Sequence, residues 1–583
     1  MAAVDSVLGA PESLWEGGER RTQDDHIARG GRALRAQRHQ LLPVLHAIQD
    51  RVGWVSRGAL DYACRRLSIP PAEAYGVVSF YARFALEERA PTVLHVCDDI
   101  ACKCAGADAL CASLEASFGP PGATWLRSPC LGLCDRAPAA MVERAGSRYE
   151  EAQVAPVDAA TAGGILRGSA WPERAGGLIR ALGEPKLLRR IGVVDPESLE
   201  SYREHGGFAA LKQAHELGPA GVIREVTEAR LLGRGGAAFP TGRKWDSVAK
   251  APARPRYLVC NADESEPGTF KDRVLMEGDP FALVEAMSIA AFATGCEKGF
   301  VYVRAEYPLA RHRVEHAISE AKRAGLLTCD IEVRRGAGAY ICGEETALFN
   351  SIEGKRGEPR NKPPFPVQAG LFGQPTLVNN VETLINVLDI VGEGGAAFAR
   401  TGTSDSTGTR LFCLSGQVRE AGLYEVPMGT TLRALIDLAG GLHPGRSLQA
   451  VLLGGAAGSF VTEAQLGVPL SFEGTRAIGA TLGSGAVMVL DDTVDAKQVL
   501  LRIARFFSDE SCGQCVPCRV GTKRQEEILE RMLGARNGDH RESDVMLLSD
   551  IAQAMRDASI CGLGQTAANA IASGLTQLRV LNG

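Results

Sequence analysis

Eight of the sixteen cysteines fall into two groups that lie far apart in the chain. The first group is Cys97-x4-Cys102 with Cys130-x3-Cys134, and the second is Cys512-x2-Cys515-x2-Cys518 with Cys561. In a chain without an export signal, thiols stay reduced, so clustered cysteines indicate metal ligands before disulfides. Each group therefore requires a fold in which two separate loops meet around one metal centre.

The spacing within each group limits the kind of metal centre. Four thiolates can bind zinc or an iron–sulfur cluster, and structural zinc usually favours C-x2-C pairs. The first group departs from that spacing, and the residues alone leave a cluster, zinc or vestigial cysteines open; Cys104 and Cys111 lie close enough to confuse the assignment. In the second group, three close cysteines and one remote cysteine suit a cuboidal [4Fe-4S] cluster, with zinc as the alternative.

A glycine-rich loop, Gly233–Lys244, precedes an apolar strand at 257–260, and the polar segment Asn261–Asp272 follows that strand directly. Small residues allow a backbone to approach a ligand and to point several N–H groups at one anion. Lys244 adds positive charge. We expect this stretch to hold a phosphorylated, ring-bearing cofactor. The loop is not G-x-G-x-x-G and follows a helical run, so the dinucleotide-fold fingerprint does not apply and a plain glycine turn is the alternative.

Composition excludes several other classes of protein. The chain has 583 residues, 45% of them hydrophobic, which predicts several domains. A net charge of -5 argues against nucleic-acid binding. No apolar run reaches the roughly 18–20 residues that a membrane span needs, and 286–294 is expected to be a buried helix. Residues 1–25 lack the apolar core of a signal peptide, so we expect a cytoplasmic protein.

The hydrophobic pattern divides the chain into segments. Helical spacing begins near Arg38, short strands follow Pro91, and helices alternate with strands from 188 to about 400, which indicates an α/β fold. The expected boundaries are 1–35 for a flexible N-terminus, 36–90 for a helical bundle, 91–155 for the first cysteine domain, 156–187 for a linker, 188–405 for the α/β domain, 406–492 for short strands around one helix, and 493–583 for a helical domain with the second cysteine group.

Four segments and the cysteine motifs stand in one order: Gly233–Lys244, Asn261–Asp272, Gly336–Glu345 and Val378–Thr383. Together they resemble the flavin subunit of respiratory complex I and its relatives, the diaphorase subunits of NAD-reducing hydrogenases and NAD-dependent formate dehydrogenases. The resemblance covers nearly the whole chain. It implies a multidomain α/β protein with a thioredoxin-like [2Fe-2S] domain, an FMN-binding domain, a β-grasp (SLBB-like) domain and a helical [4Fe-4S] domain.

The same resemblance implies the site residues. FMN would lie between the glycine loop and Asn379–Asn380, and NAD(H) would stack on it. Phe239 and Phe365 would flank the adenine. The implied cofactor-binding set is Gly233, Arg234, Gly235, Gly236, Phe239, Lys244, Asn261, Asp263, Ser265, Glu266, Glu306, Gly343, Glu344, Glu345, Phe365, Asn379, Asn380 and Thr383. All eight clustered cysteines would be metal ligands.

Three carboxylates of this set, Glu266, Glu306 and Glu345, would hydrogen-bond ribose or carboxamide groups and would disfavour the 2′-phosphate of NADP. Glu266 and Glu345 would orient the nicotinamide during catalysis, without acting as acid or base. Two positions depart from the family pattern, because Ala238 and Ala305 stand where glycine is common.

These features predict a diaphorase: hydride passes between NAD(H) and FMN, and single electrons pass to iron–sulfur clusters. The chain lacks a molybdenum, tungsten or nickel–iron signature, so we expect a catalytic partner subunit that carries one and holds further clusters. The complete N-terminal cysteine set and the residues Asp509–Cys515 favour the β subunit of a formate dehydrogenase. A hydrogenase or complex I-like diaphorase, and a non-catalytic iron–sulfur relay, are the alternatives.

Overall fold

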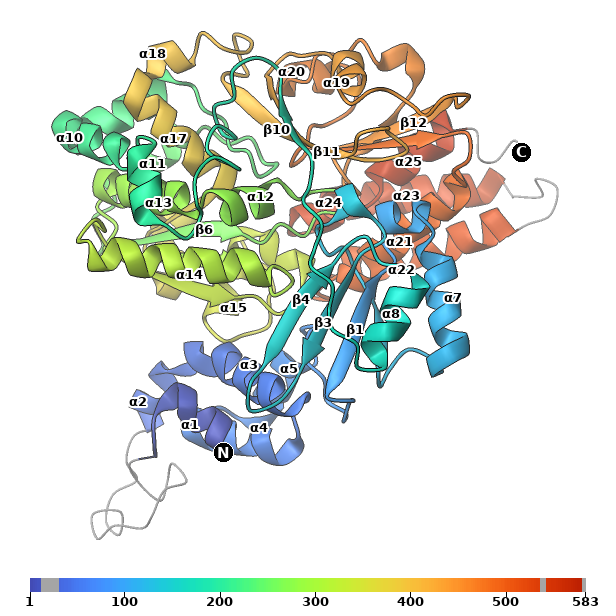
Figure 1. Cartoon of the computed structure of the whole chain (residues 1–583), viewed down its shortest axis with the longest axis horizontal. Coiled ribbons are helices and arrows are strands. Elements are labelled where there is room, and N and C mark those ends of the chain that lie inside the picture. The colour runs from blue at the N-terminus through green and yellow to red at the C-terminus, as the bar shows by residue number, and fades with distance from the viewer. Residues whose placement is uncertain (12–30, 535–541, 579–583) are drawn as a thin grey trace.

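The structure is a computed structural model that describes residues 1–11, 31–534 and 542–578. It divides into an N-terminal helical bundle, an N-terminal cysteine domain, a central domain, a β-grasp domain and a C-terminal helical domain (Figure 1). In the described ranges, no helix is both long and apolar enough to cross a membrane.

The helices of the N-terminal helical bundle are α1 (Ala2–Leu8), α2 (Gly31–Ala36), α3 (Leu41–Val52), α4 (Arg57–Leu67) and α5 (Pro71–Val78). The bundle buries apolar residues of helices α1, α3, α4 and α5. We expected residues 1–35 to be flexible, but α1 is ordered: Val4 is buried, and the Tyr62 hydroxyl donates to Asp5 Oδ1 over 2.8 Å. Residues 12–30 of that stretch lie outside the described ranges.

The N-terminal cysteine domain is a four-stranded sheet in the order β2-β1-β3-β4. Its elements are β1 (Thr92–Cys97), α6 (Ile100–Cys104), α7 (Ala107–Phe118), β2 (Trp125–Ser128), β3 (Ala140–Arg144) and β4 (Glu150–Val154). Strands β1 and β2 are parallel, with Cys97 opposite Ser128. The carboxyl ends of parallel strands share one edge, so this register brings both cysteine loops to the same edge of the sheet.

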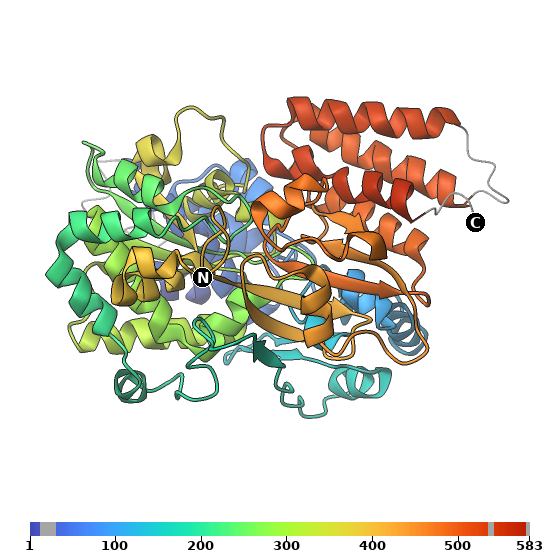
Figure 2. The same ribbon diagram turned by 90° about the horizontal axis from the view of Figure 1, so that it is seen from above.

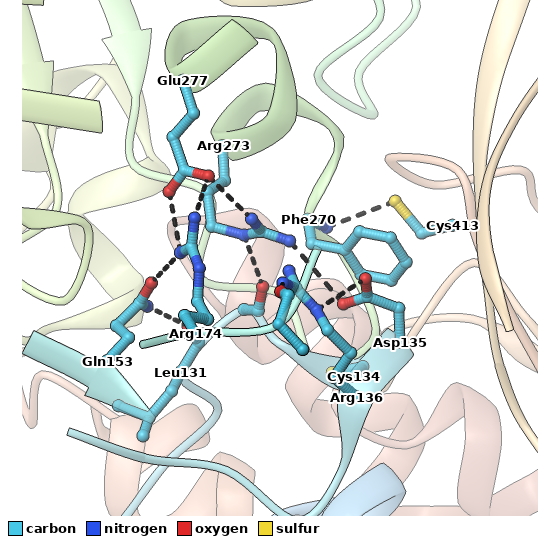
Figure 3. A network of polar contacts seen from close by, with 12 residues as sticks. Leu131, Cys134, Asp135, Arg136, Gln153, Arg174, Phe270, Arg273, Glu277 and Cys413 are labelled. Atoms are coloured by element: carbon cyan, nitrogen blue, oxygen red, sulfur yellow. Dashed lines mark hydrogen bonds and ion pairs between the residues drawn. The ribbon is translucent and has the colours of Figure 1, made fainter. Parts of the chain in front are cut away.

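The segment 156–187, expected to be a linker, contains two regular elements. Helix α8 (Ala159–Leu166) buries Ala162 and Ile165 in the core of the N-terminal cysteine domain. Strand β5 (Ile179–Ala181) pairs with the β-grasp domain. Between them, Arg174 donates to Gln153 Oε1 and Glu277 Oε1 over 2.5 and 2.9 Å (Figure 3). The linker prediction was therefore wrong for both ends of the segment, and its middle also makes cross-domain contacts.

The central domain contains an all-parallel sheet in the order β8-β7-β6-β9. Its strands are β6 (Tyr257–Ala262), β7 (Lys298–Val303), β8 (Asp330–Arg335) and β9 (Thr376–Asn380). Its longer helices are α10 (Ala209–Glu228), α11 (Thr241–Ala249), α12 (Lys271–Gly278), α13 (Pro280–Thr294), α14 (Pro308–Arg323), α15 (Glu345–Ile352) and α17 (Val381–Glu393). The segment 286–294, expected to be a buried helix, lies in α13, which is buried almost all round.

The order of these four strands fixes where a ligand can bind. The chain runs outward from β6 through β7 to β8, and then returns to place β9 on the other side of β6. In open parallel sheets, ligands bind outside the carboxyl ends of the strands at such a reversal. Asn261 of β6 is paired with Asn380 of β9 at that point. The topology therefore places a crevice between the ends of β6 and β9.

The β-grasp domain has its own apolar core and a six-stranded sheet in the order β13-β12-β14-β10-β11-β5. Its elements are β10 (Thr409–Gly416), β11 (Gly422–Pro427), α19 (Leu432–Leu438), β12 (Leu448–Leu453), β13 (Ser459–Val461), α20 (Phe472–Ala477) and β14 (Ala486–Asp491). Its buried Glu425 accepts from the backbone N–H groups of residues 186–188, which fixes the entry to the central domain.

The C-terminal helical domain lies beside the β-grasp domain (Figure 2). Its helices are α21 (Ala496–Glu510), α22 (Val516–Gly534), α23 (Glu542–Ala558), α24 (Gly562–Thr566) and α25 (Asn569–Gln577). Helix α21 is amphipathic, and residues including Val499, Ile503 and Phe507 bury its apolar face. The cysteine loop follows α21, and Cys561 stands at the N-terminus of α24. Two distant parts of the sequence thus meet at the second cysteine group.

Candidate functional site

The glycine loop closes one side of the crevice between β6 and β9. The Gly233 N–H donates to Phe239 O over 3.0 Å, and the Arg234 N–H donates to Thr383 Oγ1 over 2.8 Å. A Cβ on Gly235 would lie 3.1 Å from Asn380 Cβ. Gly236 has a φ of +113° and faces Gly483 of the β-grasp domain. The loop is thus packed closely enough to require glycine at these positions.

The side chain of Arg234 does not face the crevice as a ligand group would. It is fully buried and donates to Thr407 O and Thr409 O over 2.6 and 3.1 Å. Burial lowers the pKa of Arg234 to about 10. The arginine side chain therefore joins the glycine loop to the β-grasp domain, which leaves the backbone of Arg234 for the predicted cofactor contact.

The two asparagines at the end of β9 are held by the protein itself. Asn379 Oδ1 accepts from Trp245 Nε1 over 2.9 Å. The Asn380 side chain caps α17 and donates to Asp272 Oδ2 over 2.6 Å. On the β6 side, Asn261 donates to Gly343 O over 2.9 Å. The structure brings these predicted residues to one strand edge, where they form a rigid rim.

Asp263 is the clearest fit for a hydroxyl-bearing ligand. Ser265 Oγ donates to its Oδ1 over 3.3 Å, while its buried Oδ2 has no hydrogen-bond partner in the described parts of the chain. Burial raises the pKa of Asp263 to about 8. Because a buried polar oxygen without a partner is costly, a ribityl hydroxyl at Oδ2 would satisfy it. The donor set therefore fits FMN, with Asp263 toward the ribityl chain.

Glu266 has both carboxylate oxygens engaged within the protein. Tyr340 donates its hydroxyl to Oε2 over 2.5 Å, and the Ala457 N–H donates to Oε1 over 2.9 Å. Burial raises the pKa of Glu266 to about 7. The residue joins the polar segment to the β-grasp domain and fixes Tyr340. Sequence reasoning missed Tyr340 as a site residue, although it stands inside the motif Gly336–Glu345.

Two other predicted carboxylates are also engaged elsewhere. Glu306 is 3% exposed and accepts from Arg304 Nε over 3.2 Å. Burial opposes its charge, but Arg304 and then Arg83 outweigh burial and lower the pKa of Glu306. Glu344 Oε2 accepts from the N–H groups of Thr346 and Ala347, which caps α15. Both are predicted nucleotide or flavin contacts, and in this structure both also bind partners within the protein.

The mouth of the crevice carries the remaining predicted residues. Lys362 donates to Glu344 Oε1 and Glu345 Oε1 over 2.9 and 2.8 Å. Lys244 Nζ lies 4.0 Å from Glu345 Oε2, and burial lowers the pKa of Lys244. Phe239 and Phe365 are 45% and 52% exposed, as suits rings that stack on a base.

The first four cysteines converge at the edge of the N-terminal cysteine domain. Cys130 Sγ lies 3.3 Å from Cys134 Sγ, and hydrogen bonds to Cys102 and Cys130 raise the pKa of the Cys97 thiol. Cys111 instead lies in the apolar core of that domain. No group of three or more His, Cys, Asp or Glu residues in the described ranges is arranged for a single metal ion. The convergence of the two loops is the feature that fits a cluster.

The second cysteine group surrounds the end of α21. Cys512 and Cys515 are partly exposed, whereas Cys518 and Cys561 are buried. Ser511 Oγ lies 3.3 Å from Cys518 Sγ. Burial, with a smaller contribution from the nearby Cys512 and Cys518, raises the pKa of Cys561 to about 12. Three thiols on one loop and a fourth from another helix have the arrangement expected for a cuboidal cluster.

Both cysteine sites contact the same short segment of the central domain. Arg304 Nη1 donates to Glu264 O and its Nη2 donates to Cys130 O, each over 2.6 Å. On the other side, the Tyr340 N–H donates to Glu510 Oε2 over 2.9 Å, two residues before Cys512. Because Tyr340 also binds Glu266, the segment Asp263–Glu266 lies between the two sites.

A separate cavity of about 780 Å³ lies between the N-terminal cysteine domain and the C-terminal helical domain. Arg127, Arg502 and Cys512 are among its lining residues, and none of the predicted flavin or nucleotide residues lines it. The cavity is therefore distinct from the crevice at the strand ends.

The fold and the two kinds of site define a flavin and iron–sulfur electron-transfer protein. Four family models match it: Nuo51 FMN-binding domain over 226–389, thioredoxin-like [2Fe-2S] ferredoxin over 27–161, the NADH-ubiquinone oxidoreductase-F iron-sulfur binding region over 498–580, and SLBB domain over 411–456. The F 2 subunit of the NADH-quinone oxidoreductase of Rhizobium meliloti (strain 1021) is 46% identical over 407 residues, 68% of this chain and 96% of that protein.

Two further comparisons extend the match. The HndC subunit of the NADP-reducing hydrogenase of Solidesulfovibrio fructosivorans is 43% identical, over 66% of this chain and 80% of that protein. A crystal structure of NAD+-reducing [NiFe]-hydrogenase in the air-oxidized state has a TM-score of 0.82 at 36% identity and covers 93% of each chain.

The chain belongs to the family of the complex I 51 kDa flavoprotein. The predicted fold class, the cofactors FMN, [2Fe-2S] and [4Fe-4S], and an oxidoreductase activity as part of a complex are confirmed.

Ala238, which departs from the family glycine, has a φ of +52°. A left-handed conformation costs a residue with a Cβ roughly 1–2 kcal/mol, and glycine avoids that cost. We expect Ala238→Gly to raise the midpoint of thermal flavin release by a few degrees. Ala305→Gly is the matched control, because Ala305 is not among the described residues with positive φ and should show no gain. An equal gain in both variants would contradict this explanation.

The raised pKa of Asp263 predicts how pH affects stability without bound flavin. The folded state holds this proton up to about pH 8, whereas the unfolded chain releases it near its ordinary value of 3.8. Between these values the folded state binds more protons, so stability falls as pH rises from about 4 to 8. In Asp263→Asn, the unfolding temperature of flavin-free protein should fall less steeply with rising pH than in the parent protein. Parallel pH profiles of the two proteins would refute the assignment.

Proposed function

We propose that this chain exchanges hydride between NAD(H) and FMN and passes single electrons to the Cys512/Cys515/Cys518/Cys561 cluster. The observation that carries the proposal is the position of Asp263–Glu266, which Arg304 links to the first cysteine loop and Tyr340 links to the second. FMN supplies the conversion between two-electron and one-electron transfer when bound. The first cluster, held by Cys97, Cys102, Cys130 and Cys134, lies on the other side of the flavin segment.

The side chains of the crevice bind FMN and the nicotinamide nucleotide and orient them. Asp263 and Ser265 accept or share hydrogen bonds of the ribityl chain, and Lys244 adds positive charge beside the glycine loop. Glu345, at the mouth, accepts from the nicotinamide nucleotide, while Glu266 acts by fixing Tyr340 and the β-grasp loop. No side chain is needed as acid or base, because hydride passes directly between the two cofactors.

The carboxylates at the mouth support NAD(H) over NADP(H). Glu344 and Glu345 would repel a 2′-phosphate, although Lys362 binds both of them and reduces that effect. One relative, HndC, is named as NADP-reducing, so the family does not decide the question.

Turnover with an artificial acceptor tests the activity. Purified protein with bound FMN should oxidise NADH with ferricyanide as the electron acceptor. It should oxidise NADPH at least about tenfold less efficiently, because losing one hydrogen bond to a charged group has an effect of about that size. Protein that holds FMN and iron but shows no NADH turnover would instead support a non-catalytic relay.

We further propose that the complex is an NAD-dependent formate dehydrogenase and that this chain is its β subunit. The fused N-terminal cysteine domain, its complete cysteine set and the sequence Asp509–Cys515 support this assignment. The partner would then hold molybdenum or tungsten and further clusters. A second candidate is the diaphorase of an NAD-reducing hydrogenase, favoured by the 93% mutual coverage with that structure. Co-purification from the native source with metal analysis decides between them, because nickel in place of molybdenum or tungsten would refute the first.

The surface beside the second cysteine group marks where electrons leave. Val516, Val520 and Ile560 are 58%, 47% and 37% exposed, and they flank the partly exposed Cys512 and Cys515. Exposed apolar residues beside a redox centre fit a surface that a partner subunit covers. We propose that the catalytic partner docks there and brings its own cluster near this one.

A charge on this surface should uncouple the partner without affecting the flavin. We expect Val520→Asp to weaken binding of the partner by tenfold or more, because a carboxylate is buried in the interface. NADH oxidation with ferricyanide and the iron content should stay unchanged. Val545→Asp, on the exposed side of α23, is the matched control. Equal binding of the partner by both variants would place the docking surface elsewhere.

A further inference from the structure

Two arginines of the central domain reach the loop that carries Cys130 and Cys134. Arg304 Nη2 donates to Cys130 O over 2.6 Å, and Arg273 Nε donates to Gly132 O over 2.9 Å. Both side chains are buried, at 3% and 1% exposed. Figure 3 shows Arg273 between Glu277 and Asp135, beside Cys134. The first cysteine site is therefore completed by residues from outside its own domain.

These contacts also fix the backbone of the loop. The Gly132 N–H donates to Cys130 Sγ over 3.4 Å, and Gly132 has a φ of +67°. A Cβ at this glycine would lie 2.1 Å from the Tyr307 hydroxyl, which itself donates to Glu264 O over 3.2 Å. With the carbonyls of Cys130 and Gly132 both held, the Gly132 N–H keeps its direction toward Cys130 Sγ.

Arg304 binds the cysteine loop and its counterion through different nitrogens of the guanidinium. Its Nη2 contacts the cysteine carbonyl, whereas its counterion Glu306 binds through Nε, a different nitrogen, over 3.2 Å. On the opposite side of Cys130, Asp99 Oδ2 accepts from the Cys130 N–H over 3.2 Å and lies 3.5 Å from Arg502. That carboxylate has its own cation, so Arg304 and Arg273 are the positive groups in contact with the loop on the flavin side, and Arg304 is the one that binds the cysteine carbonyl.

We propose that Arg304, supported by Arg273, is a positioning residue that raises the reduction potential of the [2Fe-2S] cluster held by Cys97, Cys102, Cys130 and Cys134. This inference rests on the ligand set given under the proposed function. Reduction adds one electron and no compensating cation, so a nearby guanidinium stabilises the reduced form. Cluster potentials depend on net charge, on hydrogen bonds to the sulfurs and on solvent exposure, and Arg304 acts on the first two.

A redox titration of the full chain, followed by the electron paramagnetic resonance signal of the reduced [2Fe-2S] cluster, tests the proposal. In Arg304→Gln, the ratio of reduced to oxidised cluster at a fixed potential should fall about tenfold, which is a midpoint shift of about 59 mV for one electron. Arg304→Lys keeps the charge and should recover most of that ratio. Arg174→Gln removes a charge from the neighbouring network without contact to the cysteine loop, and it should change the ratio less than threefold.

Arg304→Gln leaves Glu306 buried without its cation, which can prevent assembly. The double variant Arg304→Gln/Glu306→Gln removes both charges and keeps the polar shapes, so its potential should lie between those of the parent and the single variant. A double variant with full iron content and an unchanged midpoint would overturn the inference. Parent protein without a [2Fe-2S] signal would overturn the ligand set instead, and neither result depends on NADH turnover.

Discussion

The fold depends on a short polar segment, Asp263–Glu266, that ends the buried strand β6. Glu264 accepts from the N–H groups of Asp272 and Arg273 and so caps α12, while its carbonyl accepts from Arg304 and Tyr307. Glu266 binds Tyr340 and the β-grasp domain. The segment is therefore held from within the central domain through Glu264 and from the β-grasp domain through Glu266, which gives the site the rigidity that precise cofactor placement requires.

This arrangement buries many charges, which are paired within the central domain and, at Arg273 and Asp135, across a domain boundary. Lys271 lies 3.0 Å from Glu382 with both side chains unexposed, and Arg273 contacts Asp135 and Glu277. Buried pairs give little net stability, but removing one partner costs roughly 3–5 kcal/mol because the other charge stays buried. Such pairs therefore fix how the domains meet more than they stabilise the chain. In an electron carrier the distance between centres is set in the same way.

Sequence reasoning predicted the parts of the fold that depend on local pattern. The strand that ends at Cys97 and the buried helix around 286–294 follow from runs of apolar residues, and the β1–β2 register then brings the cysteine loops together. It failed where a segment gains its structure from distant partners. Strand β5 is three residues long and exists because β11 offers an open edge. Nothing in the residues 156–187 alone carries that information.

The same limit applies to the candidate site. The glycine loop and the strand-end polar residues lie at one edge of the sheet, and tight loops and strand ends have local signatures. The contacts that Arg234, Glu306 and Glu344 make within the protein could not be predicted, since a charged residue within a motif can bind the ligand or the scaffold, and the choice depends on its nearest partner in space. For Arg234 that partner is the backbone at Thr407, far along the sequence.

The contacts of the β-grasp domain give it a part in the candidate site. Gly236 of the glycine loop faces Gly483, the Ala457 N–H binds Glu266, and the Arg234 side chain binds backbone carbonyls at the start of β10. Each of these contacts reaches a residue that either touches the crevice or supports it. A change in how this domain sits would therefore move both the glycine loop and the segment that follows β6. In the proposed flavin site the domain forms one wall, built on a separate core.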